Sequence, residues 1–293
     1  MVEFAINENT IYIKKHRRPI KLYLIGLFII ALGTALFFAA PFLYMFLMSL
    51  IKDSNTVLAY PPVFFSDHPY FNNYPEAWNY ISFFTKLGNT LLIMVSTTVL
   101  SLTSSILVAY GFTRFENKYS NVFFMILLST MMLPWVVTMI PAYAEFEYLG
   151  WIGTRMPLII PAIGGSAFNV FMIRQFMVSI PKDLDEAAKI DGCSSFTILW
   201  KIIVPQLKPV IATLLVYSFI SGWSDYIGPS IYLQTTPEYY TLSLGMQQFF
   251  SATGSADWTK VMAASITYSI PLILVVALCQ KAFVRGQIGS AIK

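Results

Sequence analysis

The stretch DLDEAAKIDGCSSFTILWKIIVP, residues 183–205, carries four acidic side chains between long apolar runs. Pro181, just before it, suits the first turn of a helix, where the missing N–H of proline costs nothing. The first acids then lie near the positive end of the helix dipole, and Lys189 lies near its negative end. The stretch is therefore predicted to begin with a short polar helix.

A second helix is predicted after a tight turn in the same stretch. Gly192 follows the first helix directly, and glycine is the usual left-handed residue at the end of a helix. Ser194 or Ser195 can cap the following helix, FTILWKII, which ends near Pro205. The pattern predicts a helix, a glycine turn and a second helix.

The first of these helices has one closely approachable face. Its members recur at the i, i+3, i+4 and i+7 spacing of a helix and are Leu184, Ala187, Ala188 and Asp191. A solvated loop that happens to be helical needs neither two alanines nor a cap glycine in register. A helix that fits a partner's groove does need them, so we interpret this face as a docking surface.

The chain as a whole is too apolar for a soluble globule. Of its 293 residues, 56% are hydrophobic and only 12% are charged, whereas soluble domains carry about 25% charged residues. A soluble protein with an unusually large core is the alternative, but the apolar runs are longer than a soluble core needs. The net charge of +4 is too small and too scattered to indicate a nucleic-acid partner.

Six apolar segments are long enough to cross a membrane, because about 20 helical residues span about 30 Å of hydrocarbon. They are residues 22–51, 89–113, 121–143, 157–175, 207–227 and 262–281. We expect the long first segment to be one tilted helix, with Pro41 as a candidate kink. A cleaved signal peptide is the alternative there, but its apolar core spans only about 7–15 residues.

The basic residues predict how these segments are oriented. Fifteen lie on one side: Lys14, Lys15, Arg17, Arg18, Lys21, Arg114, Lys118, Arg174, Lys182, Lys189, Lys201, Lys208, Lys281, Arg285 and Lys293. The other side has four, which are Lys52, Lys86, Arg155 and Lys260. We therefore expect a multi-pass protein of the cell membrane with both termini and the opening stretch in the cytoplasm.

The sequence has no motif that supplies energy or catalysis. It contains no GxxxxGK[ST], no HExxH and no GxSxG, and its cysteines and histidines have no metal-ligand spacing. The segments hold almost none of the ionisable residues that coupled carriers use. Prolines recur in them, at Pro41, Pro134, Pro141, Pro161 and Pro271, and five together favour a bundle that bends around a pathway. We expect a path whose energy comes from a partner, without a metal site or a catalytic residue.

The opening stretch resembles the EAA signature of ABC importer permeases, E-A-A-x3-G-x9-I-x-L-P. Glu186, Ala187, Ala188, Gly192, Ile202 and Pro205 match it, and Val204 stands where the family usually has Leu. Other stretches look like the maltose-permease type of the oligosaccharide-uptake branch. They are NTLLIM from Asn89, TMMLPWVVTMIP from Thr130, IRQFMVSIPKDLDEAA, TLSLGMQQF from Thr241 and QKAFVRG near the C-terminal end.

The resemblance implies an all-α membrane protein, a type I ABC importer permease of six transmembrane helices with a cytoplasmic helix-turn-helix coupling loop. One permease domain would span residues 1–293, with a cytoplasmic segment 1–21, the coupling loop at about 178–206 and a cytoplasmic tail 282–293. The residues expected to couple the chain to an ATPase are Asp183, Glu186, Ala187, Ala188, Asp191, Gly192, Ile202 and Pro205. The tail is a further candidate for ATPase contact.

The resemblance also implies a set of partners. They are a second homologous permease subunit, two ATPase subunits, an extracytoplasmic solute-binding protein, the lipid bilayer and a sugar or oligosaccharide. This chain would bind no cofactor itself, because ATP and Mg belong to the ATPase subunits. The resemblance names no particular sugar, and it leaves open which of the two permeases holds most of the substrate site.

Candidate substrate contacts lie near the ends of the apolar segments. They are Trp135, Trp223, Asp225 and Tyr226, because aromatic faces stack on sugars and a carboxylate bonds sugar hydroxyls. The aromatic loop of residues 60–80 is a candidate contact for the binding protein. An aromatic belt at the membrane interface is the plainer alternative for the aromatic residues, and capping of a helix end is the alternative for Asp225.

Two other classes of function are consistent with parts of the sequence. A membrane enzyme acting on lipid or glycan would use DLDEAAKID as a carboxylate-rich site. Its acids are interleaved with lysine on a polar loop, whereas catalytic acids need apolar surroundings or a metal. A non-transporting scaffold or sensor is the third class. The EAA resemblance favours a transport subunit over both.

Overall fold

The computed structural model of the chain describes residues 4–7, 10–13, 22–57, 68–115, 117–250 and 257–291. The elements in chain order are β1 (Phe4–Asn7), β2 (Thr10–Ile13), α1 (Leu22–Ser49), α2 (Ser54–Val57), α3 (Asn73–Tyr80), α4 (Phe83–Arg114), α5 (Ser120–Thr130), α6 (Trp135–Tyr148), α7 (Met156–Ile159), η1 (Ile160–Gly164), α8 (Ala167–Val178), α9 (Asp183–Ile190), α10 (Ser195–Ile198), η2 (Leu199–Ile203), α11 (Val204–Gln206), α12 (Lys208–Ser224), α13 (Ile227–Tyr232), η3 (Pro237–Tyr239), α14 (Leu242–Met246), η4 (Gln247–Phe249) and α15 (Trp258–Ala291). Of the η elements, η2 is a π-helix and the others are 3-10 helices.

The predicted helical membrane architecture is confirmed. Among the described residues, four continuous stretches are long and apolar enough to cross a membrane: α1, α4, the run from α7 to α8, and α15. Two bent pairs, α5 with α6 and α10–α11 with α12, raise the number to six if each pair is one span. Every segment predicted from the sequence overlaps one of these stretches or pairs.

The prolines act differently from one helix to the next. The third predicted segment is not one straight helix, because α5 and α6 meet at 91° across a break that ends at Pro134. Proline lacks the N–H that would continue the helix and pushes the residue before it out of the α region. Pro41 and Pro271, in contrast, lie inside the continuous helices α1 and α15.

A small β-hairpin precedes the helices and was not predicted. Strands β1 and β2 pair antiparallel, with Phe4 opposite Ile13 and Asn7 opposite Thr10. The cationic residues 14–21, which carry part of the orientation argument, lie outside the described residues. At the other end, α15 continues to Ala291, so most of the predicted tail extends the last helix.

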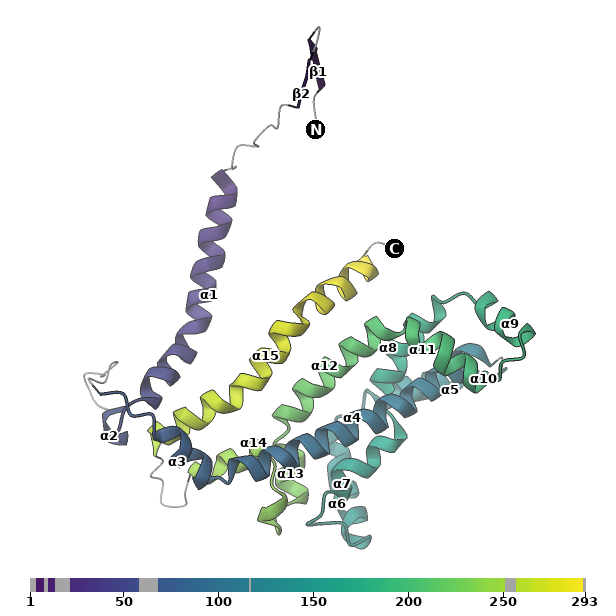
Figure 1. Cartoon of the computed structure of the whole chain (residues 1–293). Coiled ribbons are helices and arrows are strands. Elements are labelled where there is room, and N and C mark those ends of the chain that lie inside the picture. The colour runs from purple at the N-terminus through teal and green to yellow at the C-terminus, as the bar shows by residue number, and fades with distance from the viewer. Residues whose placement is uncertain are drawn as a thin grey trace.

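Helix α4 is the centre of the packing. It contacts α8, η1 and α12 along its length (Figure 1). The approach is close where Gly165 adopts φ +76°, because a Cβ there would lie 3.1 Å from Ser105 Oγ. One apolar cluster surrounds the α9 end of α4 and a second surrounds its α3 end, so both ends of this helix are anchored.

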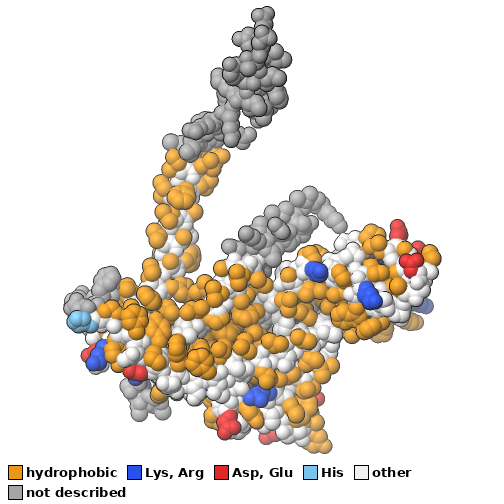
Figure 2. Space-filling model, in the orientation of Figure 1, with side chains coloured by type: hydrophobic (Ala, Val, Ile, Leu, Met, Phe, Trp, Pro, Cys, Tyr) orange, Lys and Arg blue, Asp and Glu red, His pale blue; other side chains and the backbone are white. Residues whose placement is uncertain are grey.

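Helix α1 stands apart from the bundle (Figure 1). Its membrane-length window is 0% buried, and its flank is covered by hydrophobic side chains (Figure 2). Near its C-terminal end, Met48 and Ile51 pack with Val57 against the start of α15. Most of α1 therefore presents an apolar surface that the rest of the described chain does not cover.

Candidate functional site

The predicted helix–glycine–helix is present in the α9–α11 loop, residues 183–206. Helix α9 carries three acids in its first turn and Lys189 in its last. Gly192 adopts φ +78°, its N–H donates to Lys189 O at 3.0 Å, and the N–H of Cys193 donates to Ala188 O at 2.9 Å. These two bonds are the Schellman pattern that closes a helix end, so the left-handed glycine cap is confirmed.

The second helix of this loop is segmented. Ser194, rather than Ser195, is its N-cap, and its Oγ accepts the N–H of Thr197 at 3.3 Å. The chain then passes through α10, the π-turn η2 and α11, and bends by 77° before α12 begins at Lys208. Pro205 lies in the first turn of α11 and does not end the helix there.

Helix α9 has a buried face and an exposed face. Asp185 and Ala188 are buried against the chain itself, so of the two alanines only Ala187 is available to another subunit. This corrects the predicted docking face. The exposed face contains the predicted contacts Asp183, Glu186, Ala187 and Asp191, together with Leu184.

Two exposed apolar side chains of the loop were missed by the sequence analysis. Ile190 at the end of α9 is 88% exposed, and Phe196 at the start of α10 is 67% exposed. They flank the Gly192 turn. Of the remaining candidates, Ile202 is half-buried and Pro205 is exposed. The loop therefore presents acids beside exposed apolar side chains.

A further site was missed because its two partners are far apart in the sequence. Arg114 Nε and Asp185 Oδ2 form an ion pair at 2.5 Å, and both side chains are almost fully buried. Arg114 also donates through Nη2 to Ile180 O at 3.0 Å. Arg114 therefore joins the end of α4 both to Ile180, which precedes α9, and to Asp185 in the first turn of α9.

A polar cleft of about 650 Å³ lies where α4, α6, α8 and α12 approach each other. Its lining is rich in hydroxyl groups and consists of Thr97, Thr98, Ser101, Trp135, Leu158, Ala162, Ser166, Asn169, Tyr217, Ser218, Ser221, Gly222 and Asp225. Asn169 Nδ2 donates to Ser101 Oγ at 3.2 Å, which links α8 to α4 across the lining. The cleft can form hydrogen bonds in both directions with a hydroxylated molecule.

Two of the four predicted substrate residues, Trp135 and Asp225, line this cleft. Trp223 does not, and its assignment to the pathway is wrong. It is 1% exposed, its ring stacks on Phe219 at 5.6 Å between centroids, and its Nε1 donates to Tyr268 O at 3.1 Å. Its neighbours satisfy both the apolar ring and the N–H, so it is a core residue.

Tyr226 lines an adjoining pocket of about 490 Å³. Its hydroxyl donates to Gln247 Oε1 at 2.7 Å. This pocket lies beside the segment 238–242, which α4 holds in place: Asn89 Nδ2 donates to Glu238 O at 2.7 Å, and Thr90 Oγ1 accepts the N–H of Leu242 at 2.8 Å. Two of the stretches that carry the family resemblance therefore meet here.

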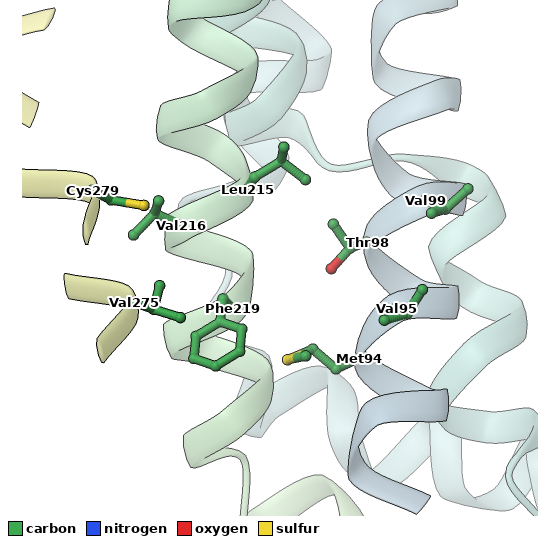
Figure 3. A pocket seen from close by; sticks show the side chains of 9 residues that line it. All are labelled: Met94, Val95, Thr98, Val99, Leu215, Val216, Phe219, Val275 and Cys279. Atoms are coloured by element: carbon green, nitrogen blue, oxygen red, sulfur yellow. The ribbon is translucent and has the colours of Figure 1, made fainter. Parts of the chain in front are cut away.

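A third cavity, of about 340 Å³, lies between α4, α12 and α15 (Figure 3). Apolar side chains such as Val95, Leu215 and Phe219 line it, and Thr98 and Cys279 are its only other kinds of side chain. It offers little to orient a polar molecule. Of the aromatic loop of residues 60–80, residues 68–80 are described and residues 60–67 lie outside the described residues, and its contact with a binding protein stays a prediction.

The amino-acid sequence matches a protein family described as "Binding-protein-dependent transport system inner membrane component" over residues 101–288. The match includes the α9–α11 loop, the cleft-lining helices from α6 to α12 and most of α15.

Curated relatives agree with this match. The sn-glycerol-3-phosphate transport system permease protein of Yersinia pestis is 32% identical over 85% of this chain and 90% of its own length. The arabinooligosaccharides transport system permease protein of Bacillus subtilis is 30% identical over 76% of this chain and 79% of its own length. Both are permease components of transport systems.

A solved structure has the same fold. A chain of a bacterial ABC transporter involved in the import of the acidic polysaccharide alginate superposes with a TM-score of 0.78 at 26% identity. The match covers 88% of this chain and 95% of that one. The fold of the chain, its sequence family and its helix–glycine–helix loop therefore all indicate the same class of protein.

Proposed function

Because the chain belongs to the family of binding-protein-dependent transport system inner membrane components, and is thus a multi-pass permease subunit of an ABC importer, we propose that it imports a sugar or oligosaccharide. It is a transport component and not an enzyme, as its relatives are permease proteins. The energy for import comes from ATPase subunits that act on the α9–α11 loop.

The observation that carries this proposal is the two-sided geometry of α9. One face is anchored to the chain by Asp185 and Ala188, while the other exposes acids next to Ile190 and Phe196. An exposed helix that is anchored on its other face and presents acids beside apolar side chains fits the groove of a partner. We therefore assign the exposed members of the predicted set, with Gly192 as the turn, to contact with an ATPase subunit.

The complete assembly has the partners implied by the resemblance. Two ATPase subunits bind ATP and Mg, an extracytoplasmic solute-binding protein delivers the sugar, and this chain binds no cofactor. The apolar surface of α1, which the described part of the chain leaves uncovered, is available to lipid and to a second homologous permease. The protein lies in the cell membrane with its termini and the α9–α11 loop in the cytoplasm.

The test is to add an affinity tag to the chain, purify it from the membrane and identify the proteins that accompany it. We expect two ATPase subunits and a second permease to copurify, and ATP-driven sugar uptake after reconstitution with the binding protein. The chain freed of every other subunit should hydrolyse no ATP. Hydrolysis that remains in the isolated chain, or uptake that proceeds without ATP, would contradict the proposal.

A further inference from the structure

We propose that the cleft of about 650 Å³ selects a neutral saccharide over a phosphorylated or carboxylated one, and that Asp225 is the residue that discriminates. The inference rests on the proposed function, because it names the charge class of the substrate that passes this subunit. The charge selectivity of the cleft can be absent while the chain still imports a sugar.

The cleft lining contains almost no charged side chains. Among the residues that line the cleft there is one carboxylate, Asp225, and no Lys, Arg or His. Proteins recognise phosphates and carboxylates chiefly through Arg, Lys and clustered N–H donors. An anion in this cleft would therefore meet a carboxyl group and no cationic side chain.

A cationic side chain close in sequence to the lining is already engaged. Arg155, one turn before the lining residue Leu158, donates to Asn89 Oδ1 at 2.7 Å and stacks over Tyr239 at 4.1 Å. The N-terminus of α8 also borders the cleft, but the N–H of Ser166 is donated to Ser105 Oγ at 3.1 Å. The Arg155 guanidinium is therefore not free to replace the missing cation.

The polar groups that remain available are suited to a neutral, hydroxylated molecule. Among the described residues, the hydroxyls of Thr98, Tyr217 and Ser218 make no hydrogen bond, and neither does the indole N–H of Trp135. A hydroxyl group both donates and accepts, as sugar hydroxyls do. Trp135 is 46% exposed, so its ring also offers an apolar face for stacking.

The absence of a cationic side chain from the cleft lining distinguishes this chain from what two of its similar proteins would need. One of them is named for sn-glycerol-3-phosphate and another for the acidic polysaccharide alginate, and both of those compounds are anionic. The relative named for arabinooligosaccharides handles an uncharged saccharide. The lining of this cleft places the chain with the neutral class.

The test measures binding to the assembled transporter in lipid nanodiscs, without its binding protein, so that only the permeases contribute selectivity. Equilibrium dialysis compares three probes: arabinotriose, sn-glycerol-3-phosphate and an alginate trisaccharide. We expect arabinotriose to bind about tenfold more tightly than either anion, given one unpaired charge at a partly solvated site. Asp225→Asn should narrow this ratio, and Asp225→Lys should reverse it.

Glu238→Gln is the matched control, because Glu238 is exposed and lies outside the cleft lining. It should leave the ratio unchanged. The inference is overturned if either anion binds wild type as tightly as arabinotriose, if Asp225→Lys does not shift the ratio, or if none of the probes binds. Loss of ATP-driven uptake in the wild-type assembly would instead refute the proposed function, and the two failures are therefore distinguishable.

Discussion

Arg114 and Asp185 join the end of α4 to the first turn of α9 through an ion pair, with Nε 2.5 Å from Oδ2. Helix α4 also supplies three residues of the polar cleft, Thr97, Thr98 and Ser101. A movement imposed on α9 by an ATPase would therefore reach a helix that lines the substrate path. The tie is strengthened by the hydrogen bond from Arg114 to Ile180 O.

Asp185→Ala should destabilise the protein by about 3–5 kcal/mol, because removing one partner of a buried pair leaves the other charge uncompensated. Replacing both partners, Arg114→Met with Asp185→Leu, should recover most of that loss. Asp191→Ala is the control on the same loop, where an exposed acid is worth at most about 0.5 kcal/mol. Thermal unfolding in detergent measures all three, and equal losses for Asp185→Ala and Asp191→Ala would contradict the role of the pair.

Much of the fold follows from the sequence because a bilayer imposes a simple requirement. A helix that crosses it needs about 20 apolar residues, so the six segments could be recognised without knowledge of their packing. The turn at Gly192 was equally predictable, since a left-handed helix end strongly favours glycine. These features depend on local chemistry alone.

The features that were missed depend on contacts between distant parts of the chain. Asp185 resembles its acidic neighbours in sequence, and its buried ion pair depends on Arg114, which is distant in the sequence. Trp223 looked like a substrate residue because an aromatic at a helix end suits either a ligand or a core. Pro134 breaks its segment while Pro41 does not, so the presence of a proline does not by itself predict a break.

Glu186→Lys should reduce sugar uptake steeply while leaving the amount of protein in the membrane near normal. Glu186 is exposed in the first turn of α9, where a positive charge opposes the helix dipole by about 0.3–1 kcal/mol. That cost is too small to unfold the bundle, but the altered charge faces the expected partner.

Val204→Leu is the control for Glu186→Lys, because Val204 lies in the same loop but is half-buried. The change also introduces the leucine that the EAA signature has at this position. It should be nearly silent. Expression, uptake and recovery of ATPase subunits in pull-downs measure both variants. Normal uptake by Glu186→Lys would argue against contact between this face and an ATPase.

Cys193 should be modified by a membrane-impermeant thiol reagent in inside-out vesicles and not in intact cells. The expectation follows from the fifteen-to-four distribution of basic residues, which predicts that the α9–α11 loop lies in the cytoplasm. Cys193 is half-buried at the turn, and Cys279 lines the apolar cavity and should react slowly from either side. Modification of Cys193 from outside the cell would reverse the proposed orientation.

Ser82→Gly should stabilise the protein by up to about 1 kcal/mol. Ser82 is the only non-glycine residue with positive φ in the described part of the chain, at +52° between α3 and α4. A residue with a Cβ destabilises the folded state by about 1–2 kcal/mol in this conformation. Glycine removes that strain, but part of the gain is lost because glycine also makes the unfolded chain more flexible. Ser82→Val should be destabilising, and a thermal midpoint lower for Gly than for Ser would contradict the assignment of strain.

Gly192→Asp should uncouple transport without unfolding the protein. Gly192 has φ +78° and no atom within 4 Å of a Cβ placed there, so the substitution adds about 1–2 kcal/mol of backbone strain but no clash. The spans do not depend on this turn, and the protein should accumulate normally in the membrane. Uptake and recovery of ATPase subunits should fall, because the turn is distorted and a new charge faces the partner. Gly192→Asn matches it in size without the charge and tolerates positive φ, so it should retain more activity; if Gly192→Asp transports as well as wild type, the turn has no coupling role.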